Sequence, residues 1–397
     1  MTAQMDTAEV ESAGEFTLSE DKVMLRDSAR DYLAQTCDLE TVRGWDEAGE
    51  FPMHVFREFG DMGWLGIPFP EEYGGTEGDE VDEALILSEL GHALGPLASA
   101  FLISAMTCGK TIRDLGTPEQ LQRWIPGICD GSIMFAYALT EPQAGSDAAA
   151  ITTRAAHAEN GWIITGEKVF CTGASLASHL LVMARVDTGS ASDGGGVGMF
   201  VVETNQPGVT VSDIPKLGLH TTPSASIHFD TVVVPDGSAL GEPGKAWGHV
   251  TSSLNRERLA ISAMCTGMAQ AAVDVAVKYA SEREQFGVTI DSFDAIQQHL
   301  AEMLIQVEGA RALMMHAAYL ESKGASSTRV ASTAKLKATD AAVNTARLGM
   351  QVMGGYGYTN EFPMQRFLRD SLVHPIAGGS NEIQRNIISD SLVRDGI

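Results

Sequence analysis

The hydrophobic pattern of the chain changes twice, and the order of the three patterns restricts the possible fold more than any other feature. Residues 16–135 carry apolar side chains at helical spacing, residues 136–243 contain short β-rich runs between turn residues, and residues 244–397 return to helical spacing. Helical segments on both sides of one β-rich segment indicate an α+β protein. We therefore expect an N-terminal helical domain, a middle β-barrel-like domain and a C-terminal four-helix bundle.

Individual helices and strands can be predicted within these segments. Ser19 as N-cap predicts a helix at 21–34, and Thr117 followed by Pro118 predicts the start of another helix. Acidic residues 1–15 lack an apolar run and are expected to form a disordered tail, and residues 189–196 are expected to form a loop. The other predicted helices are 81–94, 98–115, 247–283, 293–322, 327–353 and 381–393. The predicted strands are 161–166, 179–184, 198–202 and 226–234.

The excess of acidic residues limits the classes of partner. The chain of 397 residues has 52 acidic and 27 basic side chains, which gives a formal net charge of −25. Such a charge would be repelled by a nucleic-acid backbone or an anionic membrane. No apolar run of about 18 residues predicts a membrane-spanning helix, and the N-terminus has neither the basic nor the apolar region of a secretory signal. We expect no nucleic-acid or membrane partner.

The cysteines and histidines show no metal-binding pattern. The five cysteines are scattered without a CxxC pair, which favours free thiols in a reducing compartment and therefore a cytoplasmic protein. The ten histidines show no metal-ligand spacing and no HExxH motif. The run GASLA at 173–177 also lacks the pattern of a nucleophile elbow. No metal site is expected.

Two motifs in the β-rich segment carry side chains that suit a ligand site. The run YALTEPQAGSD at 137–147 combines hydroxyl groups at Thr140 and Ser146 with turn residues, and the run GEKVFCTG at 166–173 adds Thr172 on a strand. In this order and spacing, the two runs resemble the β-domain signature of the acyl-CoA dehydrogenase flavoproteins. The resemblance covers nearly the whole chain from about residue 18 and implies an FAD-dependent oxidoreductase that acts on acyl-CoA.

The resemblance assigns ligand contacts to both motifs. It places Leu139 and Thr140 at the pyrimidine end of the flavin, and Phe170 and Thr172 at its other side. Many relatives have Trp at the position of Phe170, and either aromatic ring can pack against a flavin. Ser146 matches a serine that contacts the CoA substrate near the thioester. Without the resemblance, these residues would be read as strand hydroxyls, a core aromatic ring and a turn residue.

Further FAD contacts are implied in the C-terminal segment. The runs REQFG at 283–287 and QVMGGYG at 351–357 resemble family segments that reach the FAD of a neighbouring subunit, which implies a homodimer or a homotetramer. The two glycines at 354 and 355 would also suit a helix C-cap. Asp294 stands where many relatives have Gln. The implied FAD contacts in this segment are Arg283, Phe286, Gln351, Gly354, Gly355, Ser380 and Glu382.

The catalytic base departs from a common pattern of the family. Many members carry the proton-abstracting Glu in a C-terminal loop, and here Gly378 stands at that position. Isovaleryl-type and long-chain-type members carry the Glu on the first long C-terminal helix, just before an Arg, and Glu257 with Arg258 matches this arrangement. A solvated Glu between Arg256 and Arg258 is the alternative. The predicted helix sets Glu257 within a stripe of apolar residues, where burial raises a carboxyl pKa: Val250, Leu254, Ile261, Met264 and Met268.

Together these features predict an enzyme that converts an acyl-CoA to a trans-2-enoyl-CoA. The resemblance implies that Glu257 removes the α-proton while the β-hydride passes to flavin N5, and that the backbone N–H of Gly378 stabilises the enolate. Arg258 would orient the site, and an electron-transfer flavoprotein would accept the electrons. The absent side chain at residue 378 leaves two alternatives: a flavin-dependent monooxygenase of the same fold, and a non-catalytic subunit of a heteromeric dehydrogenase.

Overall fold

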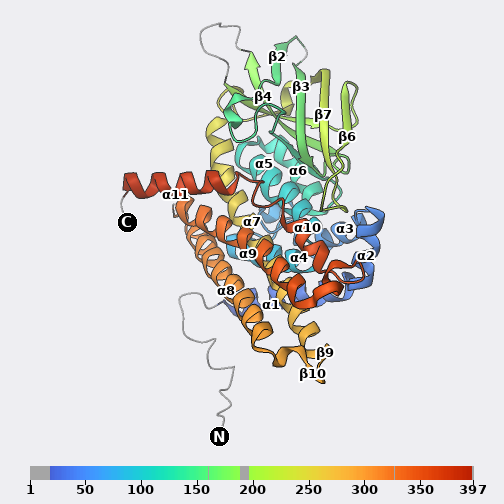
Figure 1. The fold of residues 1–397 in the computed structure, drawn as a ribbon. Coiled ribbons are helices and arrows are strands. Elements are labelled where there is room, and N and C mark those ends of the chain that lie inside the picture. The colour runs from blue at the N-terminus through green and yellow to red at the C-terminus, as the bar shows by residue number, and fades with distance from the viewer. Residues whose placement is uncertain (1–17, 160, 188–195, 326, 396–397) are drawn as a thin grey trace.

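The chain folds as a helical part, a β-sheet and a second helical part, in the predicted α+β order. The structure, a computed structural model, describes residues 18–159, 161–187, 196–325 and 327–395. The predicted tail at 1–15 and nearly all of the predicted loop at 189–196 lie outside these residues. Figure 1 shows the sheet at one end of the molecule and the long helices of both helical parts packed together at the other.

The N-terminal helical part begins at Glu20 and ends at Cys129. Thr117 caps its last helix, because its side chain accepts from the Gln120 N–H and the Gln120 side chain accepts from the Thr117 N–H. Ser19 occupies the N-cap position of the first helix, but its side chain forms no capping hydrogen bond. The α-helices of this part are α1 (Glu20–Thr36), α2 (Leu39–Ala48), α3 (Met53–Asp61), α4 (Glu80–Phe101), α5 (Lys110–Leu115) and α6 (Pro118–Cys129).

The predicted gap between helices 81–94 and 98–115 corresponds to a kink in α4. The backbone leaves helical geometry at Leu94, with φ −159° and ψ 100°, two residues before Pro96. Proline lacks the N–H that a helix requires and its ring crowds the preceding turn, so the helix is interrupted there. Beyond the kink, α4 runs into a π-helix, η2 (Leu102–Gly109), which packs against the first strand and the longest C-terminal helix. π-helical turns within α-helices often lie at functional sites.

The middle part is one mixed sheet of eight strands in the order β6-β7-β3-β2-β4-β5-β8, with β1 also paired to β4. Strands β1 and β2 run parallel to β4, and the other pairs are antiparallel. The sheet is open, because β6 and β8 end the path without pairing to each other, so the barrel-like closure that we predicted is not formed. The strands are β1 (Phe135–Ala138), β2 (Arg154–Ala158), β3 (Gly161–Thr172), β4 (His179–Asp187), β5 (Val197–Glu203), β6 (Val209–Asp213), β7 (Ser224–Val234) and β8 (Ala239–Leu240).

The C-terminal part contains three long helices that pack against one another, α7, α8 and α9. The last helix, α11, packs against α9 and projects from the body in Figure 1, so it does not complete a bundle of four. A short hairpin of β9 (Glu284–Gln285) and β10 (Val288–Thr289) joins α7 to α8, and the 3-10 helix η6 (Gly354–Tyr358) follows α9. The helices are α7 (Trp247–Glu282), α8 (Asp294–Ser322), α9 (Thr328–Met353), α10 (Met364–Ser371) and α11 (Asn381–Asp395).

The fourth long helix of the bundle is α4, from the N-terminal part. It packs against α7 and α8. Glycines allow the two backbones to approach closely, because a Cβ atom at Gly91 would lie 2.2 Å from the Met264 carbonyl oxygen, and one at Gly267 would lie 1.9 Å from that of Ser88. The predicted bundle within 244–397 was therefore wrong in its membership, because helical spacing does not show which helices pack together.

Two helical stretches, Glu80–Leu115 and Trp247–Glu282, are long and apolar enough to cross a membrane by length and composition. In each stretch, 78% of the most apolar window is buried inside the protein. The stretches pack against each other in the helical core, and core helices of globular domains meet the same criteria. Their apolar character is therefore accounted for by burial.

Candidate active site

The loop before α11 and the first turns of α7 bring Glu257 next to Gly378. An ideal Cβ atom built on Gly378 would lie 3.5 Å from Glu257 Oε1 and 2.3 Å from Ile261 Cδ1. Gly378 has φ +61°, a conformation that glycine adopts without strain. Ile261 thus fills the space into which a side chain at residue 378 would point, and the Glu257 carboxylate lies beside that space.

The surroundings of Glu257 favour its neutral form more than water does. Burial raises the pKa of the Glu257 carboxyl, and the positive charges of Arg258 and Lys335 oppose this effect. The negative charge of Glu257 in turn adds to burial in raising the pKa values of Tyr137 in β1 and Cys108 in η2. A carboxyl with a raised pKa in a protein interior is typical of an acid–base group.

The solvated charge cluster considered for Glu257 is not formed. The neighbouring Arg256 points to a different partner, since its guanidinium group lies 2.6 Å from Asp114 Oδ2. Arg258 is buried, donates to Asn255 Oδ1, and keeps its Nε without a hydrogen-bond partner among the described residues. Glu257 therefore lies in the stripe of apolar residues predicted from the sequence, most of which are buried.

The two sequence motifs meet where β1 and β3 end. The Val169 N–H donates to the Thr140 carbonyl oxygen at 2.9 Å, so Leu139 and Thr140 lie beside the segment that carries Phe170 and Thr172. Phe170 is 66% exposed and has φ +58°, at a point where the register of β3 with β7 shifts. Positive φ is unfavourable for a bulky residue, and such strain is concentrated at functional sites. Phe170 is therefore not the core residue of the alternative interpretation but an aromatic ring held outward.

A buried ion pair that the sequence analysis did not find supports this region. The Lys168 ammonium group lies 2.7 Å from Glu141 Oε1 and donates to the Leu139 carbonyl oxygen at 2.9 Å, and both side chains are almost fully buried. Glu141 also accepts from the backbone N–H groups of Thr152 and Thr153. These hydrogen bonds and the lysine charge outweigh burial and lower the pKa of Glu141 to about 2. The pair fixes the backbone on both sides of Thr140.

The loop at 378–380 exposes backbone rather than side chains. Gly378 and Gly379 both have positive φ, and the Gly378 N–H donates to no acceptor among the described residues. Ser380, next in the loop, is half-buried, and Glu382 in the first turn of α11 is exposed and lies 3.6 Å from Arg385. Ser146 is exposed on the turn after β1. Within the described part of the chain, the N–H of Gly378 therefore remains available to a carbonyl oxygen of a ligand.

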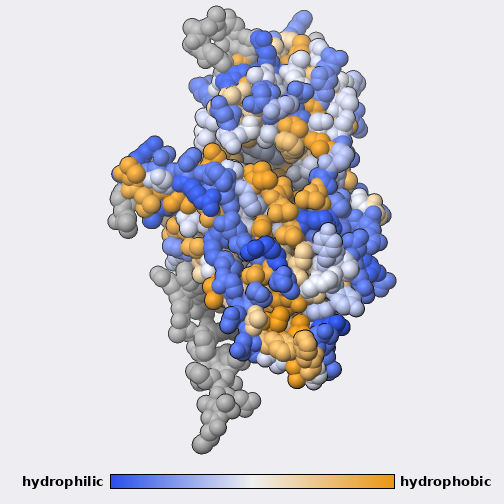
Figure 2. All heavy atoms as spheres, in the orientation of Figure 1, coloured by the Kyte–Doolittle hydropathy of each residue, from blue (hydrophilic) through white to orange (hydrophobic). Residues whose placement is uncertain are grey.

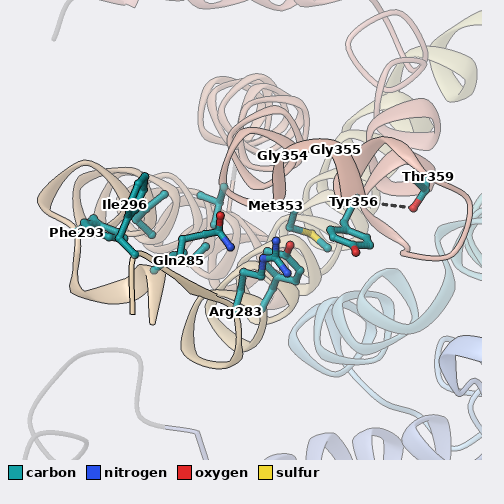
Figure 3. A pocket seen from close by; sticks show the side chains of 13 residues that line it. Arg283, Gln285, Phe293, Ile296, Met353, Gly354, Gly355, Tyr356 and Thr359 are labelled. Carbon is teal, nitrogen blue, oxygen red and sulfur yellow. Dashed lines mark hydrogen bonds between the residues drawn. The ribbon is translucent and has the colours of Figure 1, made fainter. Parts of the chain in front are cut away.

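A second group of predicted site residues gathers at the far end of the long helices. A groove of about 590 Å³ lies between the β9–β10 hairpin, the start of α8 and the end of α9. Figure 3 shows Arg283, Gln285 and Tyr356 around it, with Gly354 and Gly355 at the end of α9. The Arg283 guanidinium carbon lies 5.6 Å from the centre of the Tyr356 ring. Phe286 is 95% exposed, and apolar residues gather at this end of the molecule in Figure 2.

The two groups cannot serve one ligand within one protomer. Glu257 and Arg283 lie near opposite ends of α7, whose 36 residues end at Glu282. With a rise of about 1.5 Å per residue, roughly 39 Å of helix separates them. Gln351, Gly354 and Gly355 accompany Arg283 rather than Glu257. Arg283 and the residues beside it thus form a group apart from Glu257 and Gly378.

Comparisons with known proteins agree with this architecture. Family models of the acyl-CoA dehydrogenase N-terminal, middle and C-terminal domains match residues 19–132, 136–232 and 244–393. The chain is 36% identical to a probable acyl-CoA dehydrogenase of Bacillus subtilis, YngJ, over 96% of this chain and all of that one. It is 32% identical to subunit CarC of the caffeyl-CoA reductase-Etf complex of Acetobacterium woodii, over 95% of this chain and 99% of that one. The structure of butyryl-CoA dehydrogenase from Megasphaera elsdenii superposes with a TM-score of 0.91 at 31% identity, covering 96% of this chain and 100% of that one.

The chain belongs to the acyl-CoA dehydrogenase family. Acyl-CoA dehydrogenases are FAD-binding oxidoreductases that dehydrogenate acyl-CoA, and the predicted enzyme class and cofactor are confirmed. The features of this structure fit the cofactor. The outward ring of Phe170 offers a surface for a flavin, and Cβ atoms at Gly354 and Gly355 would meet nothing within 4 Å, so these glycines leave backbone open beside Arg283. Among the described residues of this acyl-CoA dehydrogenase, no group of His, Cys, Asp or Glu could hold a metal ion.

Replacing Arg283 by methionine is expected to weaken FAD retention. The guanidinium group is exposed in the groove, and charge-assisted hydrogen bonds to phosphate contribute about 1.5–3 kcal/mol, so the dissociation constant should rise about 10- to 100-fold. Flavin released on dilution, followed by fluorescence, measures the effect. Arg26→Met, at a guanidinium paired with Asp27 on α1, is the control. Equal flavin retention in both variants would exclude Arg283 as a contact.

Proposed function

We propose that Glu257 is the base that removes the α-proton of the acyl-CoA substrate, as in isovaleryl-type and long-chain-type members of the family. The observation that supports this most directly is the position of its carboxylate, 3.5 Å from the place of a Cβ atom on Gly378. A carboxylate can thus act at the same point in space whether it comes from the loop or from α7. The raised pKa of Glu257 also suits a base that works near neutral pH.

The reaction would use three groups of the chain around the thioester. The free N–H of Gly378 binds the thioester carbonyl oxygen and stabilises the negative charge that develops there when the α-proton leaves. Glu257 accepts that proton. Ser146 contacts the CoA portion from the turn after β1. FAD, when bound against Thr140, Phe170 and Thr172, supplies the acceptor for the β-hydride.

Arg258 would orient Glu257 and keep it ionised. Its guanidinium group is buried, bonded to Asn255 and not engaged with a carboxylate through its Nε. A buried positive charge next to the Glu257 carboxylate favours its ionised form. Arg258 thus opposes the effect of burial, which favours the protonated form of Glu257.

We also propose that the enzyme is a homodimer or homotetramer in which each FAD contacts two subunits. The support is the separation of the two groups of site residues by most of the length of α7. Arg283, Phe286, Gln351, Gly354 and Gly355 of one protomer would complete the FAD site of its neighbour. Phe286, exposed at the tip of the β9–β10 hairpin, is the side chain most suited to be covered by that contact.

The electron acceptor proposed is an electron-transfer flavoprotein. The support is the similarity to CarC, which is named as a subunit of a complex with Etf. The acidic surface, with a net charge of −25, would favour a docking partner with a basic patch.

Anaerobic mixing of the purified flavoprotein with a panel of acyl-CoA thioesters tests the reaction. We expect bleaching of the flavin absorbance and formation of a 2-enoyl-CoA for at least one saturated thioester, and return of the colour when an electron-transfer flavoprotein is added. Oxygen consumption by the reduced flavin, with no response to any acyl-CoA, would instead identify the monooxygenase alternative. A colourless chain that requires a second subunit would identify the non-catalytic alternative.

A further inference from the structure

Lys335 of α9 is a buried cation at the centre of the hydrogen bonds that hold the 378–381 loop. Its side chain is fully buried, and its ammonium group donates to the Gly379 carbonyl oxygen at 3.0 Å and to Asn381 Oδ1 at 3.1 Å. Both partners are uncharged oxygen atoms. Burying an ammonium group with only neutral partners is unfavourable, so a lysine at this position needs a further reason.

The loop is also held from the side of α11. Gln384, fully buried in that helix, donates to the carbonyl oxygens of Gly378 at 3.2 Å and Gly379 at 2.7 Å. Two buried side chains from different helices therefore fix consecutive carbonyl groups of a loop in which both glycines have positive φ. These bonds fix the two peptide units that follow Gly378, and through the backbone they constrain the preceding unit, which carries the Gly378 N–H.

Glu257 and Lys335 approach neighbouring residues of the loop, since the Glu257 carboxylate lies 3.5 Å from the place of a Cβ atom on Gly378 and Lys335 donates to the Gly379 carbonyl oxygen. The positive charge of Lys335 acts on Glu257, and the charge of Glu257 acts on Lys335. The charge of Asp340 also acts on Lys335, and the two groups are linked by Asn381, whose Nδ2 donates to Asp340 Oδ1 at 2.9 Å while its Oδ1 accepts from Lys335. Burial lowers the pKa of Lys335 to about 8, so the group is still an ammonium ion at neutral pH.

We propose that Lys335 is a positioning residue for the reaction, because it fixes the loop that presents the Gly378 N–H and places a positive charge near the neighbouring Glu257 carboxylate. The inference rests on the proposed role of Glu257. Other titratable groups act on the pair from each neighbouring element: Arg258 and Cys265 from α7, Asp340 from α9, His374 from the segment after α10, Glu382 from α11, Tyr137 from β1 and Cys108 from η2.

The positive charge of Lys335 determines in which direction its loss shifts the pKa of Glu257. An ammonium ion near a carboxylate lowers the pKa of that carboxylate, so the loss of Lys335 leaves Glu257 protonated over a wider pH range. In Lys335→Met, we expect the acid limb of the pH profile of kcat/KM to move to higher pH by about one unit or more. On the acid side, kcat/KM should fall about 10-fold, and kcat should fall as well because the loop loses a bond.

Matched variants separate this effect from a general loss of packing. Lys337→Met removes a half-buried lysine two residues further along α9, bonded to Gln306 at 2.6 Å, and should leave the profile unchanged. Lys335→Arg restores a positive charge and should return the acid limb toward its original position. Lys335→Gln serves the same test if the methionine variant does not bind flavin. An acid limb that stays in place in a folded, flavin-containing neutral variant would overturn the proposal.

A second measurement does not depend on activity. The free energy of unfolding is compared between the unmodified protein and the Glu257→Gln variant over a range of pH, with and without Lys335→Met. Because the folded pKa of Glu257 is raised, the unmodified protein loses stability relative to the Glu257→Gln variant as pH rises from the unfolded pKa through the folded pKa. The Lys335→Met background should extend this loss to higher pH.

The two measurements distinguish failure of the inference from failure of the proposed base. Full activity of Glu257→Gln, together with a stability difference that still depends on Lys335, would remove Glu257 from the reaction but keep the coupling of the two groups. An inactive Glu257→Gln protein, with a stability difference unchanged by Lys335→Met, would keep the base and overturn the role of Lys335.

Discussion

Replacing Glu257 by glutamine is expected to lower kcat by about 10²- to 10⁴-fold while the protein keeps its yellow flavin. Glutamine has nearly the same size as glutamate but cannot accept the α-proton, and a positioned general base contributes a factor of this order. Because the substitution keeps the shape of the side chain, flavin binding should not change. The measurement is the rate of flavin bleaching by acyl-CoA in single-turnover conditions.

The pH dependence of the reaction rate tests the role of Glu257 in the unmodified enzyme. Burial raises the pKa of Glu257, so the carboxyl is protonated at low pH and the rate should increase as pH rises through this raised value. Glu257→Gln should lose this limb altogether. Glu302→Gln, at an exposed position of α8, is the matched control and should keep both the rate and the limb. Full bleaching by the Glu257 variant would show that another group removes the proton.

Replacing Glu141 by alanine is expected to destabilise the protein by about 3–5 kcal/mol and to release the flavin. The substitution leaves the Lys168 ammonium group buried without its partner, and breaking one side of a buried ion pair costs about this amount. The Thr152 and Thr153 N–H groups also lose their acceptor. Denaturant unfolding and the flavin-to-protein absorbance ratio measure the two effects.

A control and a double variant identify the cause. Glu167→Ala changes the exposed neighbour of Lys168 on β3 and should alter the free energy of unfolding by less than about 0.5 kcal/mol. Glu141→Ala combined with Lys168→Met should be more stable than Glu141→Ala alone, because no unpaired charge remains. Equal destabilisation in the single and double variants would point to lost packing instead of the charge.

The ion pair of Glu141 and Lys168 also makes the stability of the folded protein depend on pH in the acid range. The pKa of Glu141 is about 2 in the folded protein and close to 4.5 without these contacts, so its stabilising effect is present above about pH 4.5. It is lost as pH falls toward 2, because protonation then breaks the pair. A Glu141→Gln protein should lack this part of the acid unfolding transition.

Much of the local structure could be predicted because its signals are local. The predicted helix at 247–283 is observed as Trp247–Glu282, and the predicted helix at 293–322 is observed as Asp294–Ser322. Both have long runs with helical spacing and turn residues at their ends. The short helices α2, α3 and α10 were not predicted, because eight to ten residues carry too few periods.

The ion pair of Glu141 and Lys168 was not predicted for a different reason. Both residues stand inside the two motifs of the β-rich segment, where the predicted contacts were those of the hydroxyl and aromatic residues beside them. A buried pair joins residues 27 positions apart, and only the packing of β3 against the turn after β1 shows that they meet. Lys335 was not predicted for the same reason, because its position along α9 does not distinguish it from an ordinary helix lysine.

The sequence by itself determined the order of the three parts, the motifs of the flavin site, the bare position at Gly378 and the apolar stripe around Glu257, because each depends on neighbours along the chain. Only the tertiary structure decided that Glu257 and Gly378 lie side by side, that α4 rather than α11 completes the helical bundle, and that Arg283 lies roughly 39 Å of helix from the base. Periodicity shows which face of an element is buried, whereas the partner of that face depends on how distant elements pack.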